Sequence, residues 1–130
     1  RRVVAQSPGR TWARFYPSLP DPLAAGEATI CAVYPDSRNP FWMPDLLEEG
    51  LEPWTVEELW VMGGPKPDEF VDVTDQFERK LAALRCHESQ HTDADGGLAE
   101  RRAGGLGLNA EAGGLDPGRL AEAYRTIDVR

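Results

Sequence analysis

Two histidines have the spacing in this chain that most resembles a metal site. His87 and His91 stand four residues apart at the end of an expected helix, and Asp93 and Asp95 follow closely. Histidines at i and i+4 lie on one face of a helix and are able to hold one metal ion from that face. The alternative is structural: His87 continues the apolar stripe of Leu84 as a half-buried side chain, and His91 reaches solvent. We favour the structural alternative.

A second candidate is Asp21, which stands between Pro20 and Pro22. It falls at an expected junction between a loop and a helix, where α/β folds place ligands. An aspartate at such a junction is also an ordinary helix N-cap, which is the interpretation we favour. The sequence contains no GxSxG, P-loop or GxGxxG motif. Local chemistry by itself therefore names no reaction.

The elements that must position these residues are predicted from β-branched runs, apolar periodicity and chain breakers. Strands are expected at residues 2–6, 56–62 and 70–73. Helices are expected at residues 22–34, 44–49, about 74–88 and 117–125.

The glycine content weakens one part of this pattern. Six glycines fall in residues 103–118, and each glycine inside a helix costs about 1 kcal/mol relative to alanine. A weak helix at best is expected there.

Strands that alternate with helices predict an α/β fold with a mostly parallel sheet. Three strands are few for this class, which suggests part of a larger domain.

Charge and length exclude several classes of protein. The chain has 130 residues and a net charge of −8, so it repels nucleic-acid backbones and we expect no nucleic-acid partner. Residues 45–78 hold eleven acidic residues and one basic residue, Lys66.

No apolar run approaches about 18 residues, so no membrane association is expected. Cys31 and Cys86 form no CxxC pair, which predicts free, half-buried thiols in a cytoplasmic protein.

The first methionine of the chain is Met43. We therefore expect the numbering to begin inside a longer reading frame, or a leading segment to have been removed.

A set of ordered segments resembles the LmbE-like, or PIG-L, family of zinc-dependent N-deacetylases, in its actinobacterial type. The segments run through most of the chain in order, and it is their combination that is specific. They are QSP at 6–8, PDPLAAGEAT at 20–29, AVYP at 32–35, RNPF at 38–41, EGLEPW at 49–54, VDVT at 71–74, the KxxALxxHxSQ pattern at 80–90 and GRLAEA at 118–123.

The resemblance implies a Rossmann-like, three-layer α/β fold, of which residues 1–130 are the C-terminal portion. It implies hydrolysis of the amide of N-acetylglucosaminyl-type substrates, in which zinc polarises the carbonyl and activates water. An aspartate is the base, and a histidine assists the tetrahedral intermediate. In the family, a first motif near the N-terminus supplies two zinc ligands and the base. A second, His-Pro-Asp-His motif supplies the third ligand and the assisting histidine.

This chain departs from that pattern at both motifs. The first motif is absent from the 130 residues. The second aligns with residues 19–22, where Leu19 and Pro22 occupy the histidine positions and Asp21 is retained. Leucine and proline have no lone pair for a metal. We expect Leu19 to be buried, Asp21 to lack the histidine it would orient, and the chain alone to bind no zinc and to be inactive.

Three further residues fall in family-like segments without a catalytic role. Arg38 is expected either to face substrate or to fix its loop by a salt bridge. His87 and Gln90 are expected to pack near the site or to support a loop.

Two functions of different classes remain open. The first is a part of a zinc N-deacetylase whose partner is an amino-sugar amide. The second is a degenerate, non-catalytic copy that binds a sugar or a partner protein. The sequence does not determine the oligomeric state.

Overall fold

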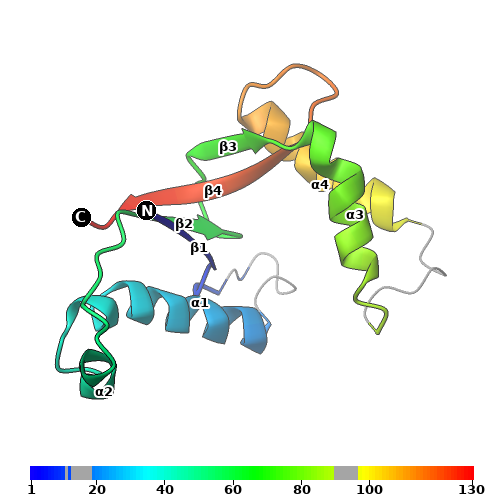
Figure 1. Cartoon of the computed structure of the whole chain (residues 1–130). Coiled ribbons are helices and arrows are strands. Elements are labelled where there is room, and N and C mark those ends of the chain that lie inside the picture. The colour runs from blue at the N-terminus through cyan, green and yellow to red at the C-terminus, as the bar shows by residue number, and fades with distance from the viewer. Residues whose placement is uncertain (11, 13–18, 90–96) are drawn as a thin grey trace. The chain divides into compact units, whose positions relative to one another are not determined.

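The computed structural model describes residues 1–10, 12, 19–89 and 97–130, which fall in two compact units (Figure 1). The first unit comprises residues 1–68 and 124–130, and the second comprises residues 69–123. The strand β4 (Ala121–Asp128) begins in the second unit and ends in the first. No helix in the described ranges is long and apolar enough to cross a membrane.

The sheet of the first unit is mixed rather than mostly parallel. β1 (Arg2–Gln6) pairs in parallel with β2 (Glu58–Met62), in a register that runs from Arg2 opposite Glu58 to Gln6 opposite Met62. β4 pairs antiparallel with the other side of β2, with Met62 opposite Tyr124. The expected strands at 2–6 and 56–62 are confirmed, whereas the expectation of a mostly parallel sheet is wrong with respect to β4.

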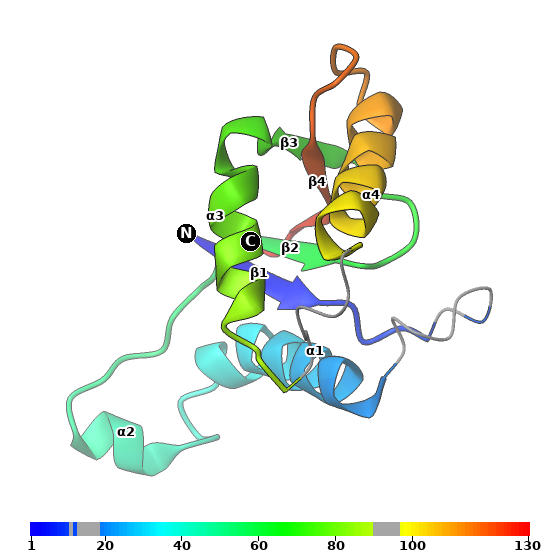
Figure 2. The same cartoon turned by 90° about the vertical axis from the view of Figure 1, so that its right-hand side faces the viewer.

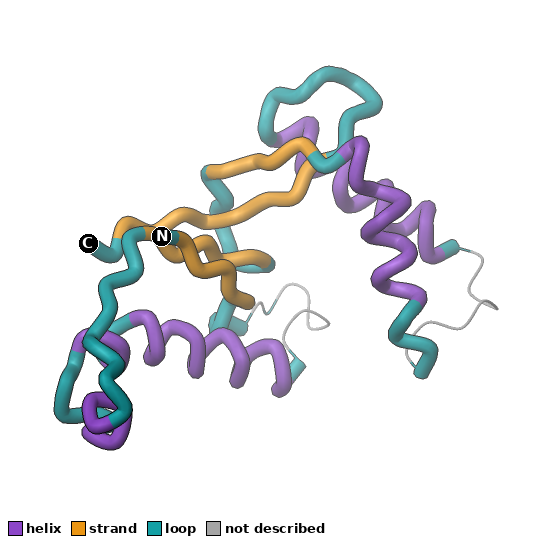
Figure 3. Tube along the Cα trace, in the orientation of Figure 1, coloured by secondary structure: helices purple, strands orange, loops and turns teal. Residues whose placement is uncertain are grey.

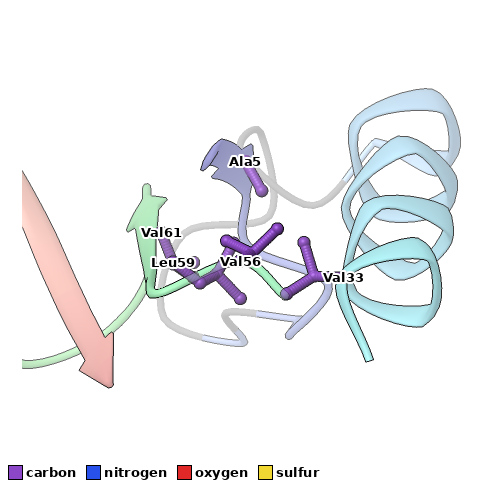
Figure 4. Close-up of a cluster of buried hydrophobic side chains, with 5 residues drawn as sticks. All are labelled: Ala5, Val33, Val56, Leu59 and Val61. Atoms are coloured by element: carbon purple, nitrogen blue, oxygen red, sulfur yellow. The ribbon is translucent and has the colours of Figure 1, made fainter. Parts of the chain in front are cut away.

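The core of the first unit lies between the β1–β2 pair and α1 (Pro20–Val33). Figure 4 shows Val33 of α1 pointing toward Ala5, Val56 and Leu59. Leu59 is 3% exposed and Val33 is 4% exposed. Burying a valine or leucine side chain contributes roughly 1.5–3 kcal/mol, so this cluster fixes α1 on the sheet.

The remaining elements of the first unit are short. A 3-10 turn, η2 (Asp36–Arg38), follows α1, and α2 (Pro44–Glu48) follows it. Gly50, with a φ of 81°, comes shortly after α2, which confirms the expected short helix and its glycine stop. A loop leads from α2 to β2 (Figure 3).

The second unit is built from β3 (Glu69–Asp72), the first residues of β4, and two helices. A 3-10 turn, η3 (Thr74–Gln76), leads into α3 (Phe77–Arg85), and α4 is Leu98–Ala112. β3 is hydrogen-bonded to β4, which confirms the expected strand at 70–73. The apolar stripe of α3 buries Leu81, which is 2% exposed.

One sequence expectation in this unit is wrong, and another is confirmed in part. A weak helix at best is expected in residues 103–118, and α4 covers residues 98–112 as a helix of 15 residues in which Leu106 and Ala110 are buried. Asn109 of α4 also donates from Nδ2 to the carbonyl of Ala121 at 3.1 Å. Residues 117–125 are expected to be helical, but residues 121–128 form β4. Packing and strand pairing outweigh intrinsic propensity in both places.

Candidate functional site at the carboxyl ends of the parallel strands

The parallel strands β1 and β2 end side by side, and small residues follow each of them. Ser7 follows β1, and its backbone N–H donates to the carbonyl of Met62 at 2.9 Å. Gly63 follows β2 with a φ of 70°, a left-handed conformation that favours glycine. Gly64 comes next, and an added Cβ there would lie 3.5 Å from Ser7 Oγ. In α/β sheets, ligands bind at this edge.

A close approach of helix to strand sets the position of α1 at this edge. A Cβ on Gly26 would lie 2.5 Å from the carbonyl oxygen of Gln6 and 3.0 Å from the nitrogen of Pro8. Only glycine therefore allows α1 to touch the end of β1. Six residues of helix span about 9 Å, and Figures 1 and 2 show that α1 begins on the side toward which β1 and β2 point. The first turn of α1 thus lies beyond the strand ends.

That first turn holds the residues that the family resemblance places at the metal. Leu19 precedes the helix in an extended conformation (φ −65°, ψ 149°) and is 45% exposed, so the expected burial of Leu19 is wrong. Asp21 is exposed and Pro22 is half-buried. Asp21 is also not the N-cap, because the helix already begins at Pro20. Proline is favoured at the first helical position because its missing N–H is not needed there.

The donor atoms of this turn do not fit a zinc ion. Asp21 contributes carboxylate oxygens, and its negative charge suits the positive end of α1. The Leu19 and Pro22 side chains carry no nitrogen, oxygen or sulfur atom. Across the described part of the chain, no group of three or more histidine, cysteine or acidic residues lies close enough to hold a metal. Among residues 19–22, Asp21 is therefore the one residue whose side chain carries metal-binding atoms.

Hydrogen-bonding groups at this edge were not expected from the sequence as site residues. Ser7 Oγ accepts a hydrogen bond from the N–H of Gly9 at 3.2 Å, which leaves the hydroxyl proton free to be donated. The Gln6 side chain is exposed, with Oε1 within 4.0 Å of the Cβ position of Gly63. Hydroxyl and amide groups of this kind suit a polyhydroxylated ligand. One feature of the sequence could have identified these residues: a serine and a Gly-Gly pair directly follow two expected strands.

Arg38 lies at the opposite end of α1, about 21 Å along a 14-residue helix. Its guanidinium donates to the carbonyls of Val56 and Val129 and lies 5.1 Å from the Tyr34 ring centroid. Arg38 Nε is buried and has no partner within the described residues. The side chain thus fixes its loop through backbone carbonyls rather than through the expected salt bridge.

The other expected site residues belong to the second unit or lie outside the described residues. His87 follows the end of α3 and is exposed, so the half-buried position expected for it is wrong. Gln90, His91, Asp93 and Asp95 lie outside the described residues. Leu19, Asp21 and Pro22 are therefore brought together, while Arg38 is remote from them.

The two cysteines are both free thiols, as expected from their spacing. Cys31 is half-buried, but Cys86 is exposed.

The chain is similar to two known deacetylases. The diacetylchitobiose deacetylase of Thermococcus kodakarensis is 39% identical to the chain over 75 residues, which are 58% of this chain and 28% of that protein. The solved structure of N,N'-diacetylchitobiose deacetylase from Pyrococcus horikoshii, in complex with its inhibitor MPG, superposes with a TM-score of 0.80 at 27% identity. The chain is homologous to these deacetylases.

The similarity supports the family resemblance and a partial LmbE-type α/β fold. The superposition covers 98% of this chain and 45% of the Pyrococcus horikoshii chain. The chain therefore spans less than half the length of the relatives that it matches. No protein-family model matches the chain.

Proposed function

We propose that this chain is the C-terminal part of an LmbE-like N-deacetylase domain that acts on N-acetylglucosaminyl-type substrates. The observation that carries the proposal is the superposition of 98% of the chain on a diacetylchitobiose deacetylase with a TM-score of 0.80. The position of Leu19–Pro22 beyond two parallel strand ends supports it, because ligands bind there in α/β folds. The segments at 6–8 and 118–123 favour the actinobacterial type, and the free thiols favour a cytoplasmic location.

We further propose that these residues alone bind no catalytic zinc and do not hydrolyse amides. Among residues 19–22, which align with the family's second motif, Asp21 is the one residue whose side chain has metal-binding atoms. The test is a zinc titration of the isolated chain by calorimetry, with metal analysis after dialysis. Weak, non-stoichiometric zinc is expected, and one tightly bound zinc per chain would contradict the proposal.

The family assignment has a separate test that does not depend on activity. The genomic reading frame upstream of Arg1 is expected to encode an Ala-His-Pro-Asp-Asp-Glu-like motif. A frame that encodes an unrelated domain there would overturn the assignment.

A second function is favoured by one observation: two metal-ligand positions are changed, at Leu19 and Pro22. In this alternative the protein is a non-catalytic module that binds a sugar or a protein. The discriminating measurement is amidase activity of the parent protein on an N-acetylglucosamine conjugate. Activity in the unmodified protein excludes the alternative. Absence of activity even after Leu19→His with Pro22→His supports it.

A further inference from the structure

An apolar pocket of about 290 Å³ lies in the first unit between the end of α1, η2 and α2. Its apolar lining includes Trp42, Met43, Leu46, Leu47 and Leu51, whose exposed fractions are 60%, 56%, 40%, 39% and 55%. Ala32 of α1 and Leu46 and Leu47 of α2 all line the pocket, and Figure 1 shows α2 below the C-terminal end of α1. Exposed apolar patches of this kind mark sites of interaction.

Nothing in the described part of the first unit covers this pocket. The whole segment from Phe41 to Thr55 is exposed, and α2 has no buried residue. Phe41, beside the lining residues, is 86% exposed. Because each of these side chains retains apolar area in contact with water, a ligand that covers the pocket would be favoured by the hydrophobic effect.

The rim of the pocket is acidic. Asp36 and Glu52 belong to its lining, and Asp45, Glu48 and Glu49 are exposed on or next to α2. None of the five carboxylates forms an ion pair with a described residue of the chain. The complement of this surface is therefore a ligand with an apolar centre and positive charges around it.

We propose that this pocket is a docking site for a basic peptide segment of a partner protein, with an aromatic or aliphatic anchor flanked by lysine or arginine. The anchor fills the space between Trp42 and Leu47, and the flanking cations pair with Glu48, Glu49 and Glu52. A volume of about 290 Å³ suits one large side chain. Because the pocket lies at the end of α1 opposite to Leu19–Pro22, a failure of peptide binding would leave the deacetylase proposal standing.

A second copy of the chain is a poorer occupant. In a two-fold contact the same surface faces itself, so the acidic rims of two copies would be brought together. Like charges placed opposite each other across an interface oppose association. The net charge of −8 on each copy acts in the same direction.

The experiment measures fluorescence anisotropy of two labelled peptides, Lys-Arg-Leu-Trp-Lys-Arg and Glu-Glu-Leu-Trp-Glu-Glu, with the whole chain. We expect the basic peptide to bind at least roughly tenfold more tightly than the acidic one, a difference of about 1.4 kcal/mol. Charge reversal by Glu48→Lys, Glu49→Lys and Glu52→Lys together, or removal of the anchor contact by Trp42→Ala, is expected to weaken it at least about tenfold.

The matched control carries the same charge change in the second unit, by Glu78→Lys, Glu100→Lys and Glu111→Lys together. All three residues are exposed, and peptide binding is expected to remain within about twofold of the unmodified chain. Circular dichroism confirms that each variant is folded. Equal binding of both peptides, or equal effects of the two triple variants, would overturn the proposal. So would a dimer in sedimentation velocity that Trp42→Ala dissociates, because a second copy would then be the occupant.

Discussion

Gly26 determines how closely α1 approaches β1. Since a Cβ at this position would lie 2.5 Å from the Gln6 carbonyl oxygen, a backbone atom, relief requires movement of the helix or the strand. Gly26→Ala is therefore expected to destabilise the protein by about 1–3 kcal/mol, as overpacking does. Urea unfolding followed by circular dichroism measures the change.

The matched control is Gly104→Ala in α4. An added Cβ there has nothing within 4 Å, so the helix propensity of alanine is expected to raise stability by about 1 kcal/mol. If both variants shift stability in the same direction by the same amount, the steric explanation of Gly26 is wrong.

Asp72 carries a pH-dependent contribution to stability. Its Oδ1 accepts hydrogen bonds from the Thr74 hydroxyl at 2.6 Å and from the Thr74 N–H at 2.9 Å. These bonds hold the pKa of Asp72 below its ordinary value. A lowered folded-state pKa means that the stabilisation is fully present above the unfolded value of about 3.9 and is lost as the pH falls below it.

Asp72→Asn is expected to lower the melting temperature near neutral pH and to flatten its decline below about pH 4. Melting curves of both proteins across this pH range measure the difference. Parallel curves for the two proteins would show that Asp72 makes no such contribution.

At the scale of elements, Leu81 is the residue that fixes α3. It is 2% exposed on a helix of nine residues. Leu81→Ala is expected to cost about 2–5 kcal/mol through lost burial and the cavity that remains. Leu108→Ala in α4, where the side chain is 64% exposed, is expected to change stability by less than about 0.5 kcal/mol. Urea midpoints of the two variants compare them, and similar losses would contradict the assigned packing.

The helices and strands also show how much of the fold can be predicted from the sequence. The strand at 2–6 was predicted with its observed bounds because β-branched residues precede a Ser-Pro-Gly break. The segment that forms β4 is expected to be helical because Leu120, Ala121 and Tyr124 would lie on one side of a helix. Its pairing with β2 is a contact between residues far apart in the chain, and local patterns contain no information about such a contact.

One part of the candidate site can be predicted from the sequence, and another part cannot. The turn at residues 19–22 was located from the family-like segment, and the structure places it beyond the strand ends. The contact of Gly26 with Gln6, and the meeting of Ser7 with Met62, depend on parallel pairing. These contacts cannot be predicted from the sequence, because glycine and serine occur in many different structural settings.

At the scale of the whole molecule, the charge of −8 and the isoelectric point near 4.7 govern non-specific binding. The chain is expected to pass through a heparin column at neutral pH and to be retained by an anion exchanger, because phosphate and sulfate polymers repel it. Elution from heparin above roughly 200 mM salt would contradict this expectation and indicate a concentrated basic surface.

The position of β1 has a practical consequence for handling the protein. β1 is hydrogen-bonded to β2 along one side and, among the described strands, to no other. Within the described residues, the outer edge of β1 therefore has no strand partner, and the side chain of Val4 is 49% exposed. Such an open side is a template on which strands from neighbouring molecules add in register. Concentrated stocks of the 130-residue chain are therefore expected to associate slowly through this edge, and a lysine in place of Val4 is expected to lengthen their shelf life.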